Sequence, residues 1–132
     1  DMERRKKVRI AVDIVNTLAA NEYEEIFTIN AFTGEPVVYK EGISKVIEEQ
    51  NKVGFKLGVE NYMKTYCMDE NPEQTAKELN LDYVKEQLEN NNTYQIYSIM
   101  DENNNIKMKR AFYTYLNKHK DTIVCTIMEV GK

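Results

Sequence analysis

The last third of the chain most strongly restricts the possible folds, because apolar and polar side chains alternate there over three long stretches. These stretches are residues 93–100, 106–117 and 122–130, and polar clusters at 101–105 and 118–121 separate them. Successive side chains of a β-strand point to opposite faces of a sheet, so alternation with a period of two is typical of a strand. Short polar clusters between such runs are typical of turns. The pattern predicts a meander of three antiparallel strands.

A pair of shorter strands is predicted earlier in the chain, around one glycine. The side chains of 26–31 alternate between two faces that both carry apolar residues, which suits a strand that is partly buried on both faces. The next segment, Thr33-Gly34-Glu35, is a turn signal, since Gly34 is free to adopt a positive φ. The run 36–39 then returns as a short strand, whose first position suits a proline. We therefore expect a β-hairpin here.

The first segment, Met2 to Ala20, predicts a long amphipathic helix. It contains no Gly or Pro, and Val8, Ala11, Val15 and Leu18 recur at 3-4-3 spacing. This apolar stripe either packs on the rest of the same chain or pairs with the helix of a second copy.

A basic stretch occupies the beginning of the same segment and consists of Arg4, Arg5, Lys6, Lys7 and Arg9. A third interpretation of the segment is therefore a patch for lipid or nucleic acid. Positive charge at a helix N-terminus opposes the helix dipole, and this mismatch is relieved if the helix continues upstream. We expect the chain to be a segment of a longer protein.

Short helices are predicted between the two groups of strands. Residues 40–58 are ambiguous, because apolar side chains with helical spacing are interrupted by glycines. A helix is expected at 59–68, and Asn71 followed by proline is a clear helix start for 72–79. Another helix is expected at 81–89. The order of elements predicts an α+β fold with one five-stranded antiparallel sheet, provided that the first strand lies beside the last, and with the short helices on one face. The 132 residues suit a single domain.

The stretch from Tyr23 to Glu35 reads Tyr-Glu-Glu-Ile-Phe-Thr-Ile-Asn-Ala-Phe-Thr-Gly-Glu. It resembles the opening hairpin of PAS-like sensor modules, in which Y-x-x-I/V-x-x-I-D/N-x-x-T-G follows an amphipathic helix. The family's H-P-E-D segment appears here as Asp-Glu-Asn-Pro-Glu at 69–73. In bacterial signalling proteins such modules precede diguanylate cyclase or histidine kinase domains. The resemblance implies a PAS-like sheet, with 1–22 as a signalling and dimerisation helix and 23–132 as the sensory domain.

The cofactors of PAS-like proteins each require particular residues. Flavin photosensing requires a reactive cysteine in an N-C-R-F-L-Q-like context, which neither Cys67 nor Cys125 has, and both are expected to be small core residues. Haem sensing usually relies on a histidine in the later helices, but the one histidine, His119, falls in a predicted turn. We therefore expect neither flavin nor haem, and no spacing typical of a metal site stands out.

No arrangement of residues typical of catalysis stands out either. Acid–base or nucleophilic chemistry requires a reactive group with an orienting partner. Every Asp and Glu is expected in a turn or on a polar helix face, in contact with water. The chain has no Gly-rich phosphate loop and no nucleophile elbow. We expect this segment not to be an enzyme.

Charge and hydropathy narrow the class of partner. The chain has 22 acidic and 18 basic side chains and a net charge of −4, which argues against nucleic acid, because phosphate binding requires clustered excess Lys and Arg. No run approaches the ~18 apolar residues of a membrane-spanning helix, so we expect no membrane contact by this segment and a cytoplasmic location. Two cysteines far apart do not form a disulfide scaffold.

Arg110 is the one candidate ligand-binding residue. It alternates with Met108 and Phe112, so an inward-pointing guanidinium is one interpretation, and it would then require a carboxylate of the protein or of a ligand. The other interpretation is that Arg110 reaches the rim of the sheet or pairs internally. Tyrosines and methionines of the last three strands would either pack under the helices or form an exposed partner-binding surface.

The sequence thus predicts a non-catalytic sensory or regulatory domain that binds a small molecule or a partner. It would relay the change through its flanking helices, as a homodimer joined by the N-terminal helix. The alternative is a structural dimerisation module without a ligand. A third interpretation is a small α+β enzyme or carrier that resembles the cone-shaped fold of nuclear transport factor two. That fold usually has an Asp/His pocket pair, which the single histidine does not suit.

Overall fold

The computed structural model describes residues 2–40, 54–102, 104–116 and 118–130. These residues form an α+β fold with one five-stranded antiparallel sheet of strand order β2-β1-β5-β4-β3. The elements in chain order are α1 (Met2–Glu22), β1 (Glu25–Asn30), β2 (Pro36–Lys40), α3 (Phe55–Tyr66), α4 (Pro72–Leu79), α5 (Leu81–Asn90), β3 (Thr93–Glu102), β4 (Asn105–Tyr115) and β5 (Thr122–Val130). The predicted fold class, the N-terminal helix and the five strands are confirmed.

The first and last strands lie side by side, as the single-sheet prediction requires. Phe27 pairs with Cys125 and Ile29 pairs with Ile123 in an antiparallel β1–β5 register. β1 is therefore an interior strand, with β2 on one side and β5 on the other. Because an interior strand satisfies its backbone groups on both edges, the start of β1 is firmly placed in the sheet.

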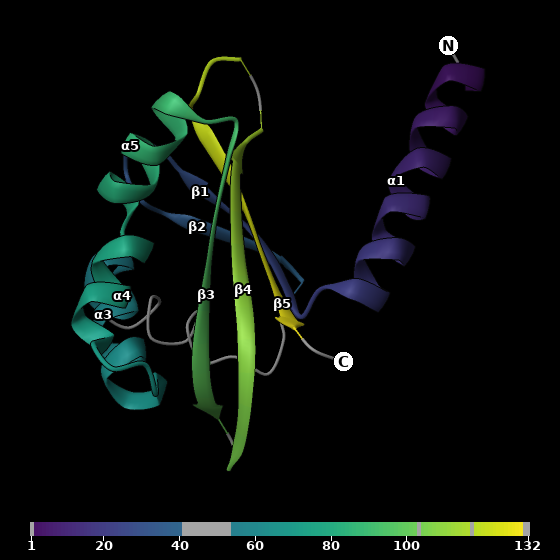
Figure 1. The fold of residues 1–132 in the computed structure, drawn as a ribbon. Coiled ribbons are helices and arrows are strands. Elements are labelled where there is room, and N and C mark those ends of the chain that lie inside the picture. Colours follow the sequence, from purple (N-terminus) through teal and green to yellow (C-terminus); the bar gives the residue numbers. More distant parts are fainter. Residues whose placement is uncertain (1, 41–53, 103, 117, 131–132) are drawn as a thin grey trace.

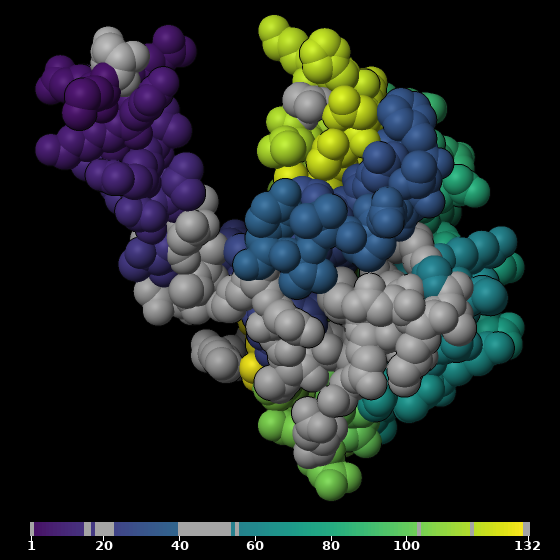
Figure 2. Space-filling model, turned by 180° about the vertical axis from the view of Figure 1, so that it is seen from behind, coloured from purple at the N-terminus to yellow at the C-terminus, as the bar shows by residue number. Residues whose placement is uncertain are grey.

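The helices α3, α4 and α5 cover one face of the sheet, which we call the inner face (Figure 1). The helix α1 extends away on the other side, and Figure 2 shows it standing clear of the rest of the molecule. The opposite sheet face, here called the outer face, carries exposed apolar side chains that include Tyr97, Ile106 and Met108. The helix α1 therefore projects from the sheet and does not lie across it.

The core lies between the inner face and the three helices, as period-two strands and apolar helix faces dictate. Its buried hydrophobic residues are Phe27, Ile29, Ala31, Val59, Tyr62, Met63, Ala76, Leu79, Val84, Leu88, Met100, Tyr113, Ile123 and Cys125. Burial raises the pKa of the Cys125 thiol well above its ordinary value, and burial also raises the pKa of the neighbouring Tyr113 hydroxyl. Both groups are held in their neutral, protonated forms in the core.

These buried acids predict a loss of stability in alkali. The unfolded chain ionises Cys near its ordinary pKa of about 8.5 while the folded chain does not, so the unfolded state releases more protons and the free energy of unfolding falls as pH rises. For Cys125 we expect a loss of about 2 kcal/mol between pH 7 and pH 10. Urea unfolding of the wild type and of Cys125→Ala at both pH values measures it. The variant should lose less on going to pH 10, and equal losses would contradict the assignment.

The start of α4 agrees with its sequence signal. Asn71 is the N-cap, and its side-chain Oδ1 accepts a hydrogen bond from the backbone N–H of Gln74 at 3.2 Å. Pro72 occupies the first turn, where its missing N–H leaves no bond unmade. Just upstream, Asp69 accepts hydrogen bonds from Thr75 and from the backbone N–H of Ile99, which ties this helix start to β3.

Several predicted boundaries were wrong. The helix expected at 59–68 is α3, which begins at Phe55 and passes through the buried Gly58, since a glycine inside a helix is costly but tolerated. The polar cluster at 101–105 is largely strand, because β3 runs to Glu102 and β4 begins at Asn105. Asn104, between the two strands, has a φ of 61°. The ambiguous segment 40–58 lies mostly outside the described residues.

Candidate functional site

A network of ionisable side chains lies on the inner face of the sheet, at the end where β1 begins and β3 ends. We call it the charged cluster, and its members are Glu24, Tyr62, Glu102, Lys107, Lys109 and Glu129. The Lys109 ammonium donates a hydrogen bond to Glu102 Oε1 at 2.8 Å, and the Tyr62 hydroxyl donates to the same oxygen. Lys109 Nζ also lies 3.1 Å from Glu24 Oε2.

Lys107 adds a second branch to the cluster. Its Nζ lies 3.3 Å from Glu129 Oε2 and 3.9 Å from Glu24 Oε1. Period-two geometry explains the arrangement, because Lys107 and Lys109 are two residues apart on β4 and therefore share the inner face. The cluster thus joins α3, the end of β3, the first half of β4, the end of β5 and the residue before β1.

The centre of the charged cluster is dry. Glu102 is 3% exposed and Lys109 is 4% exposed, and Glu25 beside the cluster is 0% exposed. The expectation that every Asp and Glu contacts water was therefore wrong for Glu25 and Glu102. Glu102 was expected in a turn, but the strand continues through it and directs its carboxylate under α3, where Tyr62 and Lys109 reach it.

Electrostatics keeps Lys109 charged in this dry site. Burial lowers the pKa of Lys109, but the hydrogen bond to Glu102 and the attraction of Glu102 and Glu24 outweigh burial and raise it above its usual value. Because the pKa of Lys109 is higher in the folded chain than in the unfolded chain, its ammonium form stabilises the fold at every pH below the ordinary lysine pKa. This contribution is lost only in strong alkali. Lys109 is therefore charged in the neutral range.

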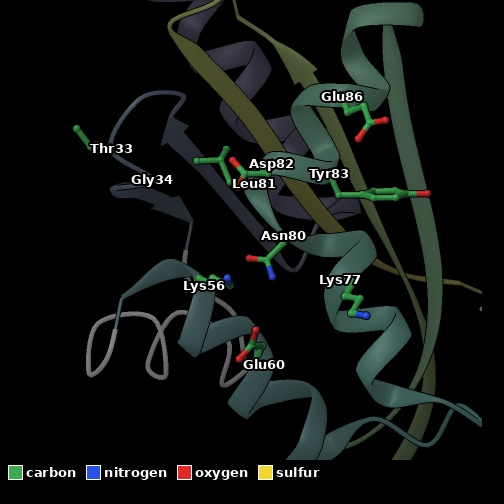
Figure 3. Close-up of a pocket in the computed structure, with 10 residues that line it drawn as sticks. All are labelled: Thr33, Gly34, Lys56, Glu60, Lys77, Asn80, Leu81, Asp82, Tyr83 and Glu86. Carbon is green, nitrogen blue, oxygen red and sulfur yellow. The ribbon is translucent and has the colours of Figure 1, made fainter.

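A surface cleft lies between the helical layer and the β1–β2 turn (Figure 3). Its volume is about 560 Å³, and it is lined by Thr33, Gly34, Lys56, Glu60, Lys77, Asn80, Leu81, Asp82, Tyr83 and Glu86. Leu81 and Asp82 point toward the turn that holds Thr33, whereas Tyr83 points away toward β3 (Figure 3). The cleft is open, and its charged side chains have both signs.

Arg110 lies on the outer face, opposite the helices, because its neighbour Lys109 occupies the inner face. Its register partners are Tyr97 and Met128, and its Nη2 donates a hydrogen bond to Met128 Sδ at 2.8 Å. No carboxylate among the described residues pairs with it, and its Nε is buried without a hydrogen-bond partner there. The guanidinium thus does not point into the core, and its role toward a ligand stays a prediction.

The residues predicted for dimerisation lie on α1. Val8 is 58% exposed, and Ala11 is exposed as well. The side chains of Val15 and Leu18 lie outside the described part of the structure, although their backbone is helical. The apolar stripe is therefore exposed at Val8 and Ala11.

The remaining candidates for chemistry fall in different places. Cys125 is buried in the core, as predicted, whereas Cys67 is half-buried and its thiol donates a hydrogen bond to Asp69 Oδ2 at 3.3 Å. Burial raises the pKa of the Cys67 thiol, which disfavours the reactive thiolate. His119 is exposed in the β4–β5 turn. Within the described ranges, no group of three or more His, Cys, Asp or Glu side chains is arranged to hold a metal ion.

Sequence reasoning missed the members of the charged cluster. The alternation of side chains along 106–117 puts Lys107 and Lys109 on the same face as the buried Tyr113, and this was the signal that could have indicated their burial.

None of the described helices is both long and apolar enough to cross a membrane. Comparison with protein-family models and with curated proteins found no match to the chain.

Proposed function

We propose that this chain is a non-catalytic, PAS-like sensory or regulatory domain of a bacterial signal-transduction protein, located in the cytoplasm. It binds a small molecule or a partner and relays the change through its flanking helices. One observation carries the proposal: a helix with exposed apolar side chains stands clear of the sheet and leads directly into the interior strand β1 (Figure 1). A change in the sheet therefore has a direct mechanical connection to α1.

The topology supports the proposal. The order β2-β1-β5-β4-β3, with helices between β2 and β3 on one face, is what the resemblance of the Tyr23–Glu35 segment to PAS-like modules implies. A ligand shifts an equilibrium only by its difference in affinity for the two arrangements. The cleft beside the β1–β2 turn is a suitable place for such a difference, because its lining comes from α3, α4, α5 and the turn, and these elements need not move together.

The second candidate function is a ligand-free dimerisation module. The core supports this second function, because the protein's own side chains fill it. Ile29, Ile123 and Cys125 are each 0% exposed. Both functions require that two chains associate through α1. They differ in whether a small molecule is retained.

Native mass spectrometry of protein purified without additives tests the proposal. We expect a dimer, with a retained small molecule if the domain is a sensor and without one if it is only a dimerisation module. A chain that stays monomeric and carries no bound molecule contradicts both functions.

A charged pair of substitutions tests the role of α1. Val15→Glu/Leu18→Glu should give a folded monomer, because two carboxylates in an apolar helix seam leave uncompensated buried charge. The matched control, Arg9→Gln/Asn16→Glu, changes the net charge equally at positions that helical spacing places away from the stripe. It should stay dimeric. If Val15→Glu/Leu18→Glu stays dimeric, or is unfolded by circular dichroism, the assigned role of the stripe is refuted.

A further inference from the structure

The charged cluster connects the helical layer to the end of α1 through successive contacts. Tyr62 of α3 donates its hydroxyl hydrogen to Glu102 at the end of β3, and Lys109 of β4 donates to the same oxygen. Lys109 in turn lies 3.1 Å from Glu24. Glu24 comes two residues after Glu22, the last residue of α1, so these contacts lead from α3 to the point where α1 meets the sheet.

The same point is held to β5. The backbone N–H of Glu24 donates a hydrogen bond to the carbonyl of Ile127 at 2.8 Å. Lys107 lies between the carboxylates of Glu24 and Glu129, at 3.9 Å and 3.3 Å. The junction of α1 and β1 is therefore held by one backbone hydrogen bond and by two lysines of β4.

We propose that the charged cluster is a latch that fixes the junction of α1 and β1 against β4 and β5, and that Tyr62 connects this latch to α3. This inference rests on the proposed function, because it assigns the relay between the sheet and α1 to the contacts of the charged cluster. The latch has two distinct states. A buried charge without its partner is strongly unfavourable. Lys109 is buried in the closed site, so if it loses a carboxylate partner, the site must open for water to reach the ammonium. The cluster is therefore either closed and paired or open and hydrated.

Hydrogen exchange of the whole chain, in the absence of any ligand, tests the latch. The readout is the exchange rate of the peptide that spans 22–27, which contains the junction. In Glu24→Gln, whose side chain keeps its shape and loses its charge, we expect this rate to rise at least tenfold. Exchange at the junction that is unchanged in Glu24→Gln would overturn the latch.

The matched control is Lys85→Met. Lys85 is another half-buried lysine, and it donates a hydrogen bond to the carbonyl of Ala31 at 2.8 Å, far from the junction. The substitution should raise exchange in α5 and the β1–β2 turn and leave the junction within twofold of the wild type. If Lys85→Met loosens the junction as much as Glu24→Gln does, the effect is general destabilisation and the latch is rejected.

A double-mutant cycle tests the connection to α3. Tyr62→Phe removes only the hydroxyl group, and it should raise exchange at the junction at least threefold, although Tyr62 contacts Glu102 and lies in the other layer. In the Glu24→Gln background the same substitution should have less than half of this effect on a logarithmic scale, since the latch is already open. Effects that multiply independently would overturn the connection.

The position of α1 supplies a second readout. Spin labels on Arg9→Cys and Lys118→Cys, both exposed, report the distance between α1 and the β4–β5 turn in a Cys67→Ser background. Labelled chains are diluted tenfold with unlabelled chains, so that only distances within one chain contribute. The distribution should broaden in Glu24→Gln and not in Lys85→Met, and an unchanged distribution would overturn the control of α1 by the latch. Failure of these tests leaves the oligomer and ligand results intact, so the latch and the proposed function fail separately.

Discussion

Replacing Lys109 with methionine is expected to lower the free energy of unfolding by about 3–5 kcal/mol, the usual cost of removing one partner from a buried ion pair. Glu102 is 3% exposed, and in the variant its buried carboxylate would lose the ammonium that pairs with it. The lost ion pair with Glu24 adds to the cost. Urea denaturation at pH 7, followed by circular dichroism, measures the change.

Two comparisons make the Lys109 result specific. Lys107→Met should cost less than Lys109→Met, because the Lys107 side chain is 17% exposed and that of Lys109 is 5% exposed, so the partners of Lys107 lie closer to water. Lys109→Met/Glu102→Gln should be more stable than Lys109→Met alone, since it removes the uncompensated charge and keeps an acceptor for the Tyr62 hydroxyl. A loss below 1 kcal/mol in Lys109→Met would show that the pair contributes little.

Ile123→Ala is expected to destabilise the protein by about 2–5 kcal/mol, as large-to-small substitutions do in packed cores. Ile123 is 0% exposed and pairs with Ile29 across the β1–β5 contact, so the cavity would form where the first and last strands meet. Thermal and urea unfolding measure the loss.

The matched control for Ile123 is the same substitution on the other face. Ile106 is 62% exposed at the beginning of β4, and Ile106→Ala should change stability by less than about 0.5 kcal/mol. Similar losses for both variants would mean that the outer face is as well packed as the inner one in solution. A dimer formed through the outer face would produce that result. Dilution to the monomer would then remove the effect of Ile106→Ala and leave the effect of Ile123→Ala unchanged.

Local rules in the sequence predicted most of the fold. Alternation located β3, β4 and β5, the Thr33-Gly34-Glu35 turn located the first hairpin, and Asn71 with Pro72 located the start of α4. The pairing of β1 with β5 was a condition of the single-sheet prediction that no local pattern supplied, and the structure meets this condition. The start of α3 was missed, since Gly58 was taken to interrupt a helix that in fact includes it.

The charged cluster was not predicted, for a chemical reason. Glu102 stands among Asp and Asn residues that ordinarily form a turn, and a glutamate is almost never fully buried unless it is paired. Its partner Lys109 is seven positions away on the facing strand, and its second partner, Tyr62, is 40 positions away on α3. Nothing in the neighbourhood of Glu102 in the sequence indicates these two partners.

The sequence by itself determined which side chains share a face, because the period of a strand and the caps of a helix are set by the backbone over a few residues. It placed Lys107, Lys109 and Tyr113 together on one face of β4. Only the tertiary structure decided that this face is dry at Lys109 and that the described side chains of α1 are exposed. Burial depends on which distant segment packs above a residue, and α3 comes to lie over the end of β3 through contacts that no local pattern encodes.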